Sequence, residues 1–74
     1  MFVKKEIVEQ LRRKYPVGTR VELIRMNDEQ APPIGTYGTV VGVDDMGSIM
    51  VAWDSGGSLS VLYGEDLCRK IENK

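Results

Sequence analysis

The sequence predicts a small, mainly β domain that begins with one α-helix and continues as five short antiparallel strands. Three observations lead to this fold class. The apolar residues recur about every fourth position up to Lys14 and every second position after Gly18, which is the change from helical to strand periodicity. Glycine-containing turns separate the alternating runs near residues 44–47 and 55–57. The length of 74 residues is that of one domain.

Residues 2–14 are expected to form an amphipathic helix. Its apolar stripe recurs at four-residue spacing, with Val8 alongside, and consists of Val3, Ile7 and Leu11. The pair Tyr15-Pro16 ends the helix, because proline disfavours the α conformation of the preceding residue. An isolated helix of this length is marginal in water, so the stripe is expected to pack on the strands or on a second copy of the chain. A homo-oligomer is therefore one expectation.

The first half of the strand region contains two alternating runs. The first run covers residues 19–24 and is followed by a loop over residues 27–35, stiffened by Pro32-Pro33. The second run, residues 37–43, leads into the turn Asp44-Asp45-Met46-Gly47, where glycine suits a tight hairpin.

The second half predicts three further strands. These are expected at residues 48–54, 58–63 and 68–72, with a 3₁₀ turn at residues 64–67 before the last strand. On this pattern the residues expected to be mostly buried are Val21, Leu23, Val40, Val51 and Leu59.

This order of elements is typical of a five-stranded SH3-like barrel preceded by one N-terminal α-helix. The sequence divides into the helix, residues 1–16, and the barrel, residues 17–74, within a single domain overall.

Two resemblances accompany the pattern. The run "YPVGTRVELIRMNDEQAPPIGTYGTVVGVDDMGSIMVAWDSGGSLSVLYGEDLCRKI" resembles an uncharacterised bacterial and phage family of small SH3-like barrels, a domain of unknown function. The later half, "GTVVGVDDMGSIMVAWDSGGSLSVLYGEDL", is similar to the Mib-Herc2 domain of eukaryotic ubiquitin ligases. That similarity implies an SH3-like barrel that recognises protein segments. The chain departs from the pattern at Gly64, where those domains often carry arginine after the tyrosine.

Composition argues against several functions. The chain has no histidine, and its one cysteine, Cys68, has no evident base partner, so thiol or serine catalysis is not expected. Zinc requires clustered Cys and His ligands, and we expect no metal, no cofactor and no enzymatic activity. No apolar run is long enough to span a bilayer, and a single cysteine favours a reducing compartment, so a cytoplasmic protein with no membrane partner is expected.

Aromatic and acidic residues of the later strands are the candidates for binding a protein segment. Trp53 shares a strand face with Ile49 and Val51, which favours the core, although the sequence leaves open whether Trp53 is core or groove. An exposed groove would suit a basic or proline-containing segment. The candidate partner-binding residues are Tyr37, Trp53, Asp54, Tyr63, Glu65 and Asp66.

The charge distribution leaves a second function open. Residues 1–20 carry six basic and two acidic side chains, whereas residues 21–74 carry four basic and nine acidic ones. A basic helix can contact phosphates through Arg12, Arg13 and Lys14, but the acidic barrel would repel a nucleic-acid backbone. The leading expectation is therefore a non-enzymatic module that binds another protein. Its expected biological setting is that of an accessory protein of a phage or mobile element. A small nucleic-acid-binding protein is the alternative.

Overall fold

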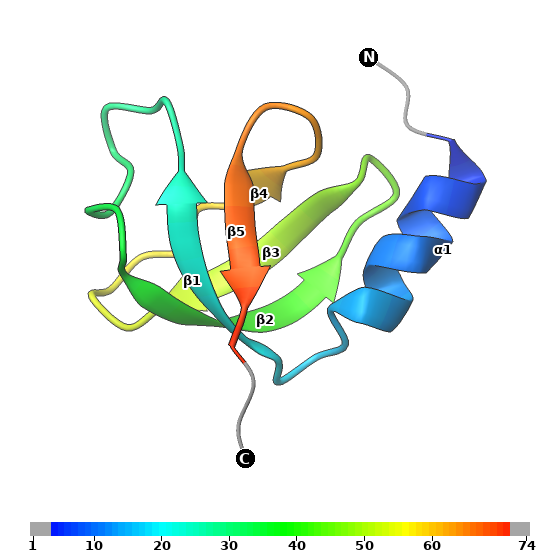
Figure 1. Cartoon of the computed structure of the whole chain (residues 1–74), viewed down its shortest axis with the longest axis horizontal. Helices are drawn as coiled ribbons and strands as arrows, with labels where there is room; N and C mark the ends of the chain where they lie inside the picture. Colours follow the sequence, from blue (N-terminus) through cyan, green and yellow to red (C-terminus); the bar gives the residue numbers. More distant parts are fainter. Residues whose placement is uncertain (1–3, 72–74) are drawn as a thin grey trace.

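The computed structural model describes residues 4–71, which form one helix and one five-stranded sheet (Figure 1). Along the chain the elements are α1 (Lys5–Lys14), β1 (Arg20–Arg25), β2 (Tyr37–Val43), β3 (Ser48–Trp53), β4 (Val61–Leu62) and β5 (Leu67–Lys70). The strand order is β4-β3-β2-β1-β5, and every neighbouring pair is antiparallel. The mainly β class, the five antiparallel strands and the N-terminal helix are thus confirmed.

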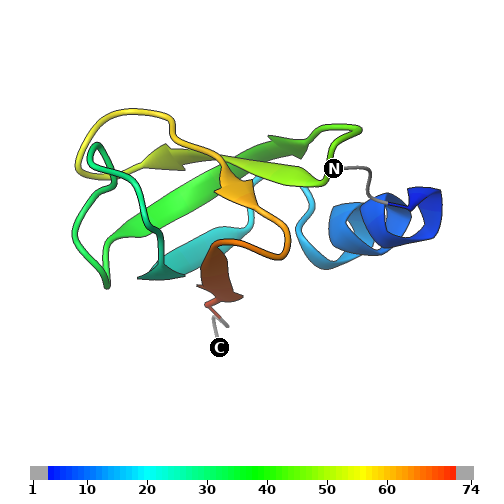
Figure 2. The same cartoon turned by 90° about the horizontal axis from the view of Figure 1, so that it is seen from above.

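The sheet curves but does not close into a complete barrel. Its two edge strands, β4 and β5, follow each other in the chain, yet no ladder of hydrogen bonds joins them. Register shifts between Val40 and Gly42 and between Leu23 and Arg25 interrupt the ladders, and such bulges increase the local twist of a sheet. The result is an open, curved sheet whose two edge strands are β4 and β5 (Figure 2).

The core is formed by the alternate side chains of the three central strands. Val21, Leu23 and Val40 are completely buried, and Val51 is 1% exposed. These four residues confirm the expected alternation, whereas Leu59 is half-buried and packs against the edge of the core. The buried cluster consists of Val8, Tyr15, Val21, Leu23, Val40, Val43, Ile49, Val51, Trp53, Val61 and Cys68.

The fourth strand is shorter than its sequence indicates. A strand was expected over residues 58–63, but only Val61 and Leu62 pair with β3. Before them, the Trp53 N–H donates to the Gly57 carbonyl oxygen, and the Leu59 carbonyl oxygen accepts a hydrogen bond from the Trp53 indole. The Leu59 carbonyl is thereby used by a side chain instead of the main chain of β3.

The connection between β4 and β5 is also different from the expected 3₁₀ turn. Residues 63–65 form a turn in which the Leu62 carbonyl oxygen accepts hydrogen bonds from the N–H groups of Glu65 and Asp66. Gly64 lies in this turn at a φ of +87°, a value that helical residues do not adopt. Strand β5 then begins at Leu67, one residue before the expected start, and Glu72 lies outside the described residues.

Helix α1 lies beside the sheet, next to the hairpin turn that joins β2 and β3 (Figures 1 and 2). Val8 is its buried residue, at 4% exposure, whereas Ile7 and Leu11 are half-buried. The expected stripe is therefore shifted towards Val8, and its first member, Val3, lies outside the described residues. Within residues 4–71, no helix combines the length and apolar character needed to cross a membrane.

A single arginine attaches the helix to the hairpin. Arg12 donates through Nε to the Val43 carbonyl oxygen at 3.1 Å and through Nη2 to Asp45 Oδ1 at 2.8 Å. Since Val8 and Tyr15 belong to the same buried cluster as the strands, the helix and the sheet share one core.

Candidate binding groove

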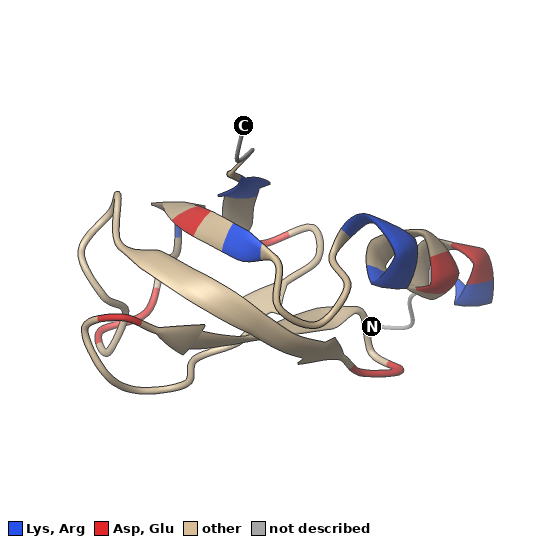
Figure 3. Cartoon of the chain, turned by 90° about the horizontal axis from the view of Figure 1, so that it is seen from below, with Lys and Arg blue, Asp and Glu red and all other residues tan. Residues whose placement is uncertain are grey.

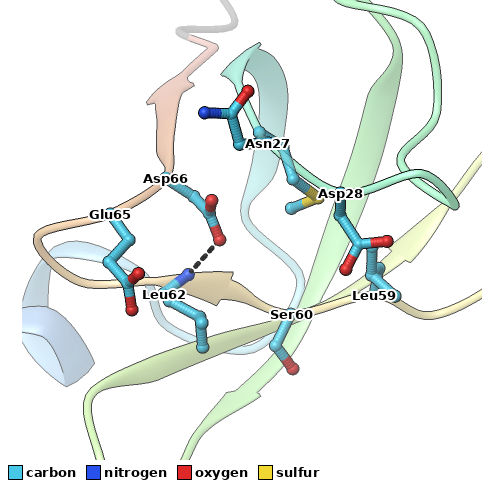
Figure 4. A pocket seen from close by; sticks show the side chains of 8 residues that line it. Asn27, Asp28, Leu59, Ser60, Leu62, Glu65 and Asp66 are labelled. Carbon is cyan, nitrogen blue, oxygen red and sulfur yellow. Dashed lines mark hydrogen bonds between the residues drawn. The ribbon is translucent and has the colours of Figure 1, made fainter. Parts of the chain in front are cut away.

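A groove of about 450 Å³ lies beside β4, on the open side of the sheet. One wall is the chain that leaves β1, and the other is the chain that passes through β4 and turns towards β5 (Figure 4). Its volume falls in the range of about 300–1,000 Å³ that is usual for ligand sites. The lining residues are Met26, Asn27, Asp28, Leu59, Ser60, Leu62, Glu65 and Asp66.

The groove combines negative charge with apolar surface. Three of its lining residues are acidic, namely Asp28, Glu65 and Asp66, and none is lysine or arginine. Three others are apolar, namely Met26, Leu59 and Leu62. Carboxylates gathered around a concave apolar surface produce a local negative potential that attracts cations.

Local hydrogen bonds orient two of these carboxylates. Asp66 Oδ2 accepts from the Leu62 N–H at 3.0 Å, across the turn between β4 and β5 (Figure 4). Asp28 Oδ1 accepts from the Gln30 N–H at 2.8 Å within the loop between β1 and β2. An ionised carboxylate offers about four acceptor positions, so both groups retain capacity for a ligand.

Trp53 is a core residue that also supports the groove. Its side chain is 4% exposed, and its Nε1 donates to the Leu59 carbonyl oxygen at 2.9 Å. The indole packs against Gly38, where a Cβ atom would lie 2.8 Å from Trp53 Cε3. Trp53 also contributes an edge to a separate cavity of about 280 Å³, beside Gln30 and residues 56–59. Through its hydrogen bond to Leu59, the buried Trp53 supports the wall of the groove from the core side.

The two candidate tyrosines do not meet in a shared aromatic groove. Tyr37 lies next to Gly38, which pairs with Trp53 at the end of β3. Tyr63 donates its N–H to the Gly47 carbonyl oxygen, just before the start of β3. The six residues of β3 therefore separate the two sites, a distance of about 17 Å at the usual rise of a strand. Both tyrosines are exposed, at 48% and 46%.

Asp54 also lies away from the groove. It forms an ion pair with Arg20, whose Nη1 is 2.9 Å from Asp54 Oδ1. The hydrogen bond from Arg20 holds the pKa of Asp54 below its usual value and raises the pKa of the arginine. Of the six candidate partner-binding residues, the structure places Glu65 and Asp66 in the groove. The sequence does not predict the remaining lining residues of the groove. These residues come together only because the loop of residues 26–28 faces residues 59–66 in the folded chain.

A second cavity, of about 280 Å³, lies between the end of α1 and β5 and includes Tyr15 and Cys68. Burial raises the pKa of the Cys68 thiol, while the Tyr15 hydroxyl and the charge of Lys14 oppose that shift. A thiol with a raised pKa is a poor nucleophile at neutral pH. Across residues 4–71, no group of three Cys, Asp or Glu side chains is placed to hold a metal ion.

The three basic residues considered for nucleic acid differ in their surroundings. Arg12 is hydrogen-bonded to the hairpin, as described above, and Lys14 Nζ lies 5.4 Å from the centroid of the Tyr15 ring. Arg13 is exposed. Figure 3 shows both basic and acidic segments on the helix, and acidic segments at several turns around the sheet.

Comparison with known proteins identifies a family but no characterised relative. No curated protein and no solved structure matches the chain, so the similarity to the Mib-Herc2 domain depends on the quoted residues alone. The sequence model of one family, described as "Domain of unknown function (DUF4314)", matches residues 4–71. This match extends from the start of α1 through the end of β5, and the chain therefore belongs to the DUF4314 family.

Proposed function

We propose that this protein is a non-enzymatic binding module that recognises a basic segment of another protein in the groove beside β4. The observation that carries the proposal is the lining of the groove, where Asp28, Glu65 and Asp66 accompany apolar side chains without any basic residue. Lysine and arginine match this surface because a cationic head ends a long apolar stem. Hydrogen bonds between such cations and carboxylates are stronger than neutral ones.

The resemblances noted in the sequence support the same kind of partner. The similarity of residues 38–67 to the Mib-Herc2 domain favours an SH3-like fold that recognises a protein segment. The resemblance to bacterial and phage proteins favours an accessory protein of a phage or mobile element. A single cysteine that is buried as a free thiol supports a cytoplasmic location.

Nucleic-acid binding through the helix has less support. Arg12 already donates hydrogen bonds to the Val43 carbonyl and to Asp45, and the Asp45 carboxylate offsets the positive charge that a phosphate would meet. The acidic groove and the excess of acidic residues over residues 21–74 would also repel phosphates.

The absence of enzymatic activity is part of the proposal. The chain has no histidine, and burial raises the pKa of its one thiol.

A peptide selection with charge-matched variants tests the proposal. Random peptides displayed on phage are selected on the protein, and their affinities are then measured for two variants. The groove variant is Asp28→Asn/Glu65→Gln, and the control is Glu6→Gln/Glu9→Gln, which removes two charges from the helix. The amide oxygen introduced by Asp28→Asn can still accept the hydrogen bond from the Gln30 N–H, so the loop is preserved.

We expect selected peptides rich in lysine or arginine that lose about tenfold or more in affinity for the groove variant, since hydrogen bonds to charged groups are worth about 1.5–3 kcal/mol each. The control variant should bind them nearly as the unmodified protein does. The proposal is wrong if no peptide is enriched, or if both variants lose affinity equally.

A further inference from the structure

The edge of the sheet next to the groove is an incomplete strand. Residues 58–61 alternate serines with larger apolar residues, as a strand with one buried face does. Val61 and Leu62 pair with β3, whereas residues 58–60 run beside it without a ladder. The strand expected over residues 58–63 is thus realised in two of its six residues.

Main-chain groups along this segment are available to a partner. The N–H and C=O groups of Ser58 and Ser60 make no hydrogen bond with any residue of the described part of the chain. The Leu59 carbonyl between them is fixed by the Trp53 indole, which holds the segment in place. Ser60 lines the groove, and Ser58 lines the neighbouring cavity beside Trp53. Backbone polar groups need partners once water leaves them, and a strand laid along residues 58–60 would supply these partners.

The two edges of the sheet differ in their protection. Strand β5 carries Arg69 and Lys70 among its four residues, and charged side chains on an edge strand discourage pairing with another chain. Residues 58–62 carry no charge, although the groove beside them is acidic. The edge at residues 58–60, just before β4, therefore admits an added strand, and its acidic surroundings select a basic one.

We propose that the partner segment binds in an extended conformation beside residues 58–60 and joins the sheet through main-chain hydrogen bonds. This inference rests on the proposed function and adds the conformation of the ligand: an extended segment with lysine or arginine at alternate positions. Strand addition of this kind obtains affinity from the main chain and specificity from alternate side chains. A second copy of this protein is not the expected ligand of the groove. Pairing the edges of two copies would bring the acidic residues of both grooves close together.

Three synthetic peptides with the same charge test the conformation. The probe is acetyl-Lys-Val-Lys-Val-Lys-Val-amide. Two derivatives carry N-methyl groups on all the valines or on all the lysines, so that each lacks the N–H donors of one strand edge. Affinities for the full chain are measured by titration calorimetry, and amide hydrogen exchange is followed at Ser58 and Ser60.

We expect the unmodified peptide to bind and to slow exchange at Ser58 and Ser60. At least one methylated derivative should bind about tenfold or more weakly, because it lacks the donors that face the sheet. Equal affinity of all three peptides would overturn strand addition and would leave the basic-segment proposal standing. Failure of all three to bind at low salt would instead contradict the proposed function itself.

Two variants of the protein at Ser60 complement the test with methylated peptides, because they change the hydrogen-bond donor on the protein instead of those on the peptide. Ser60→Pro removes one N–H donor from the edge, where proline is tolerated, whereas Ser60→Ala keeps that donor. The proline variant should lose affinity for the unmodified peptide, and the alanine variant should retain it. Equal binding by two folded variants would contradict a contact through the Ser60 main chain, and the methylated peptides remain decisive if the proline variant does not fold. Self-association through this edge, abolished by Ser60→Pro, would overturn the choice of a foreign partner.

Discussion

The indole N–H of Trp53 donates a hydrogen bond of 2.9 Å to the carbonyl oxygen of Leu59. This contact joins the core of the sheet to the wall of the acidic groove, since Trp53 is buried and Leu59 lines the groove. The same contact occupies a carbonyl of residues 58–60, which do not pair with β3. One side chain thus contributes both to stability and to the shape of the candidate site.

Trp53→Phe tests this link. Phenylalanine keeps much of the apolar contact with the core but leaves the Leu59 carbonyl without its donor. We expect a loss of about 1–3 kcal/mol in the free energy of unfolding, together with faster amide hydrogen exchange over residues 58–60. Urea denaturation and exchange measurements check the two effects. An unchanged exchange rate in that segment would show that the indole hydrogen bond does not hold the groove wall.

Gly38 is predicted to be essential for packing around Trp53. A Cβ atom at this position would lie 2.5 Å from Val51 Cγ1 and 2.8 Å from Trp53 Cε3, both in the buried core. Gly38→Ala should therefore lower the free energy of unfolding by about 1–3 kcal/mol, as overpacking does.

Gly42→Ala is the matched control for that substitution. Its Cβ would meet the Met50 methyl group at 3.0 Å, and this flexible end of a side chain can move. The control should cost clearly less than Gly38→Ala in the same denaturation experiment. Equal losses for the two variants would contradict the close packing described for Gly38.

Arg12 is predicted to stabilise the docked helix, and Arg13 is not. Arg12→Gln removes an exposed ion pair with Asp45, which contributes little, and a partly buried hydrogen bond to the Val43 carbonyl. We expect a loss of about 1 kcal/mol for Arg12→Gln and a change within about 0.5 kcal/mol for Arg13→Gln. Thermal denaturation of both variants gives the comparison, and equal melting temperatures would show that Arg12 does not attach the helix.

The pair Tyr15 and Cys68 predicts a loss of stability at alkaline pH. Burial raises the pKa values of the Tyr15 hydroxyl and of the Cys68 thiol above their ordinary values. A raised pKa in the folded state favours the protonated form. Its contribution to stability is therefore complete below the pKa of the unfolded chain and is lost as the pH rises through the folded-state pKa.

The melting temperature should accordingly fall as the pH rises from about 8.5 to beyond about 10, and the decline should be shallower in the variant Tyr15→Phe/Cys68→Ala. The slopes, not the absolute melting temperatures, are compared, because the alanine leaves a small cavity. Parallel slopes would show that other groups cause the alkaline destabilisation.

The sequence predicts the fold well where one residue pattern determines both local structure and burial. The alternation in β1, β2 and β3 identifies Val21, Leu23, Val40 and Val51 as core residues, and all four are buried. The helix is also predictable, although its buried residue is Val8, which joins the core of the sheet, and not a member of the expected stripe. The short β4 is not predictable from alternation, because the Leu59 carbonyl before it accepts a hydrogen bond from the Trp53 indole, a contact that local periodicity does not reveal.

The candidate site was predictable in part. Glu65 and Asp66 follow the fourth strand in the chain, and they do line a groove. The sequence also suggests Tyr37 and Tyr63 as members of one groove, but the register places them at opposite ends of β3. Met26 and Asp28 line the groove because the loop that contains them lies close to β4. The pattern of apolar and polar residues along the sequence does not predict this long-range contact.

The most direct test of the acidic groove is a titration of ¹⁵N-labelled protein with the alternating Lys-Val peptide, followed by amide chemical shifts. The binding account predicts the largest shift changes at residues 26–28 and 58–66, with weaker binding at higher salt because the groove is charged. Shift changes confined to helix α1 or to the outer face around Tyr37, or none at low salt, would contradict it.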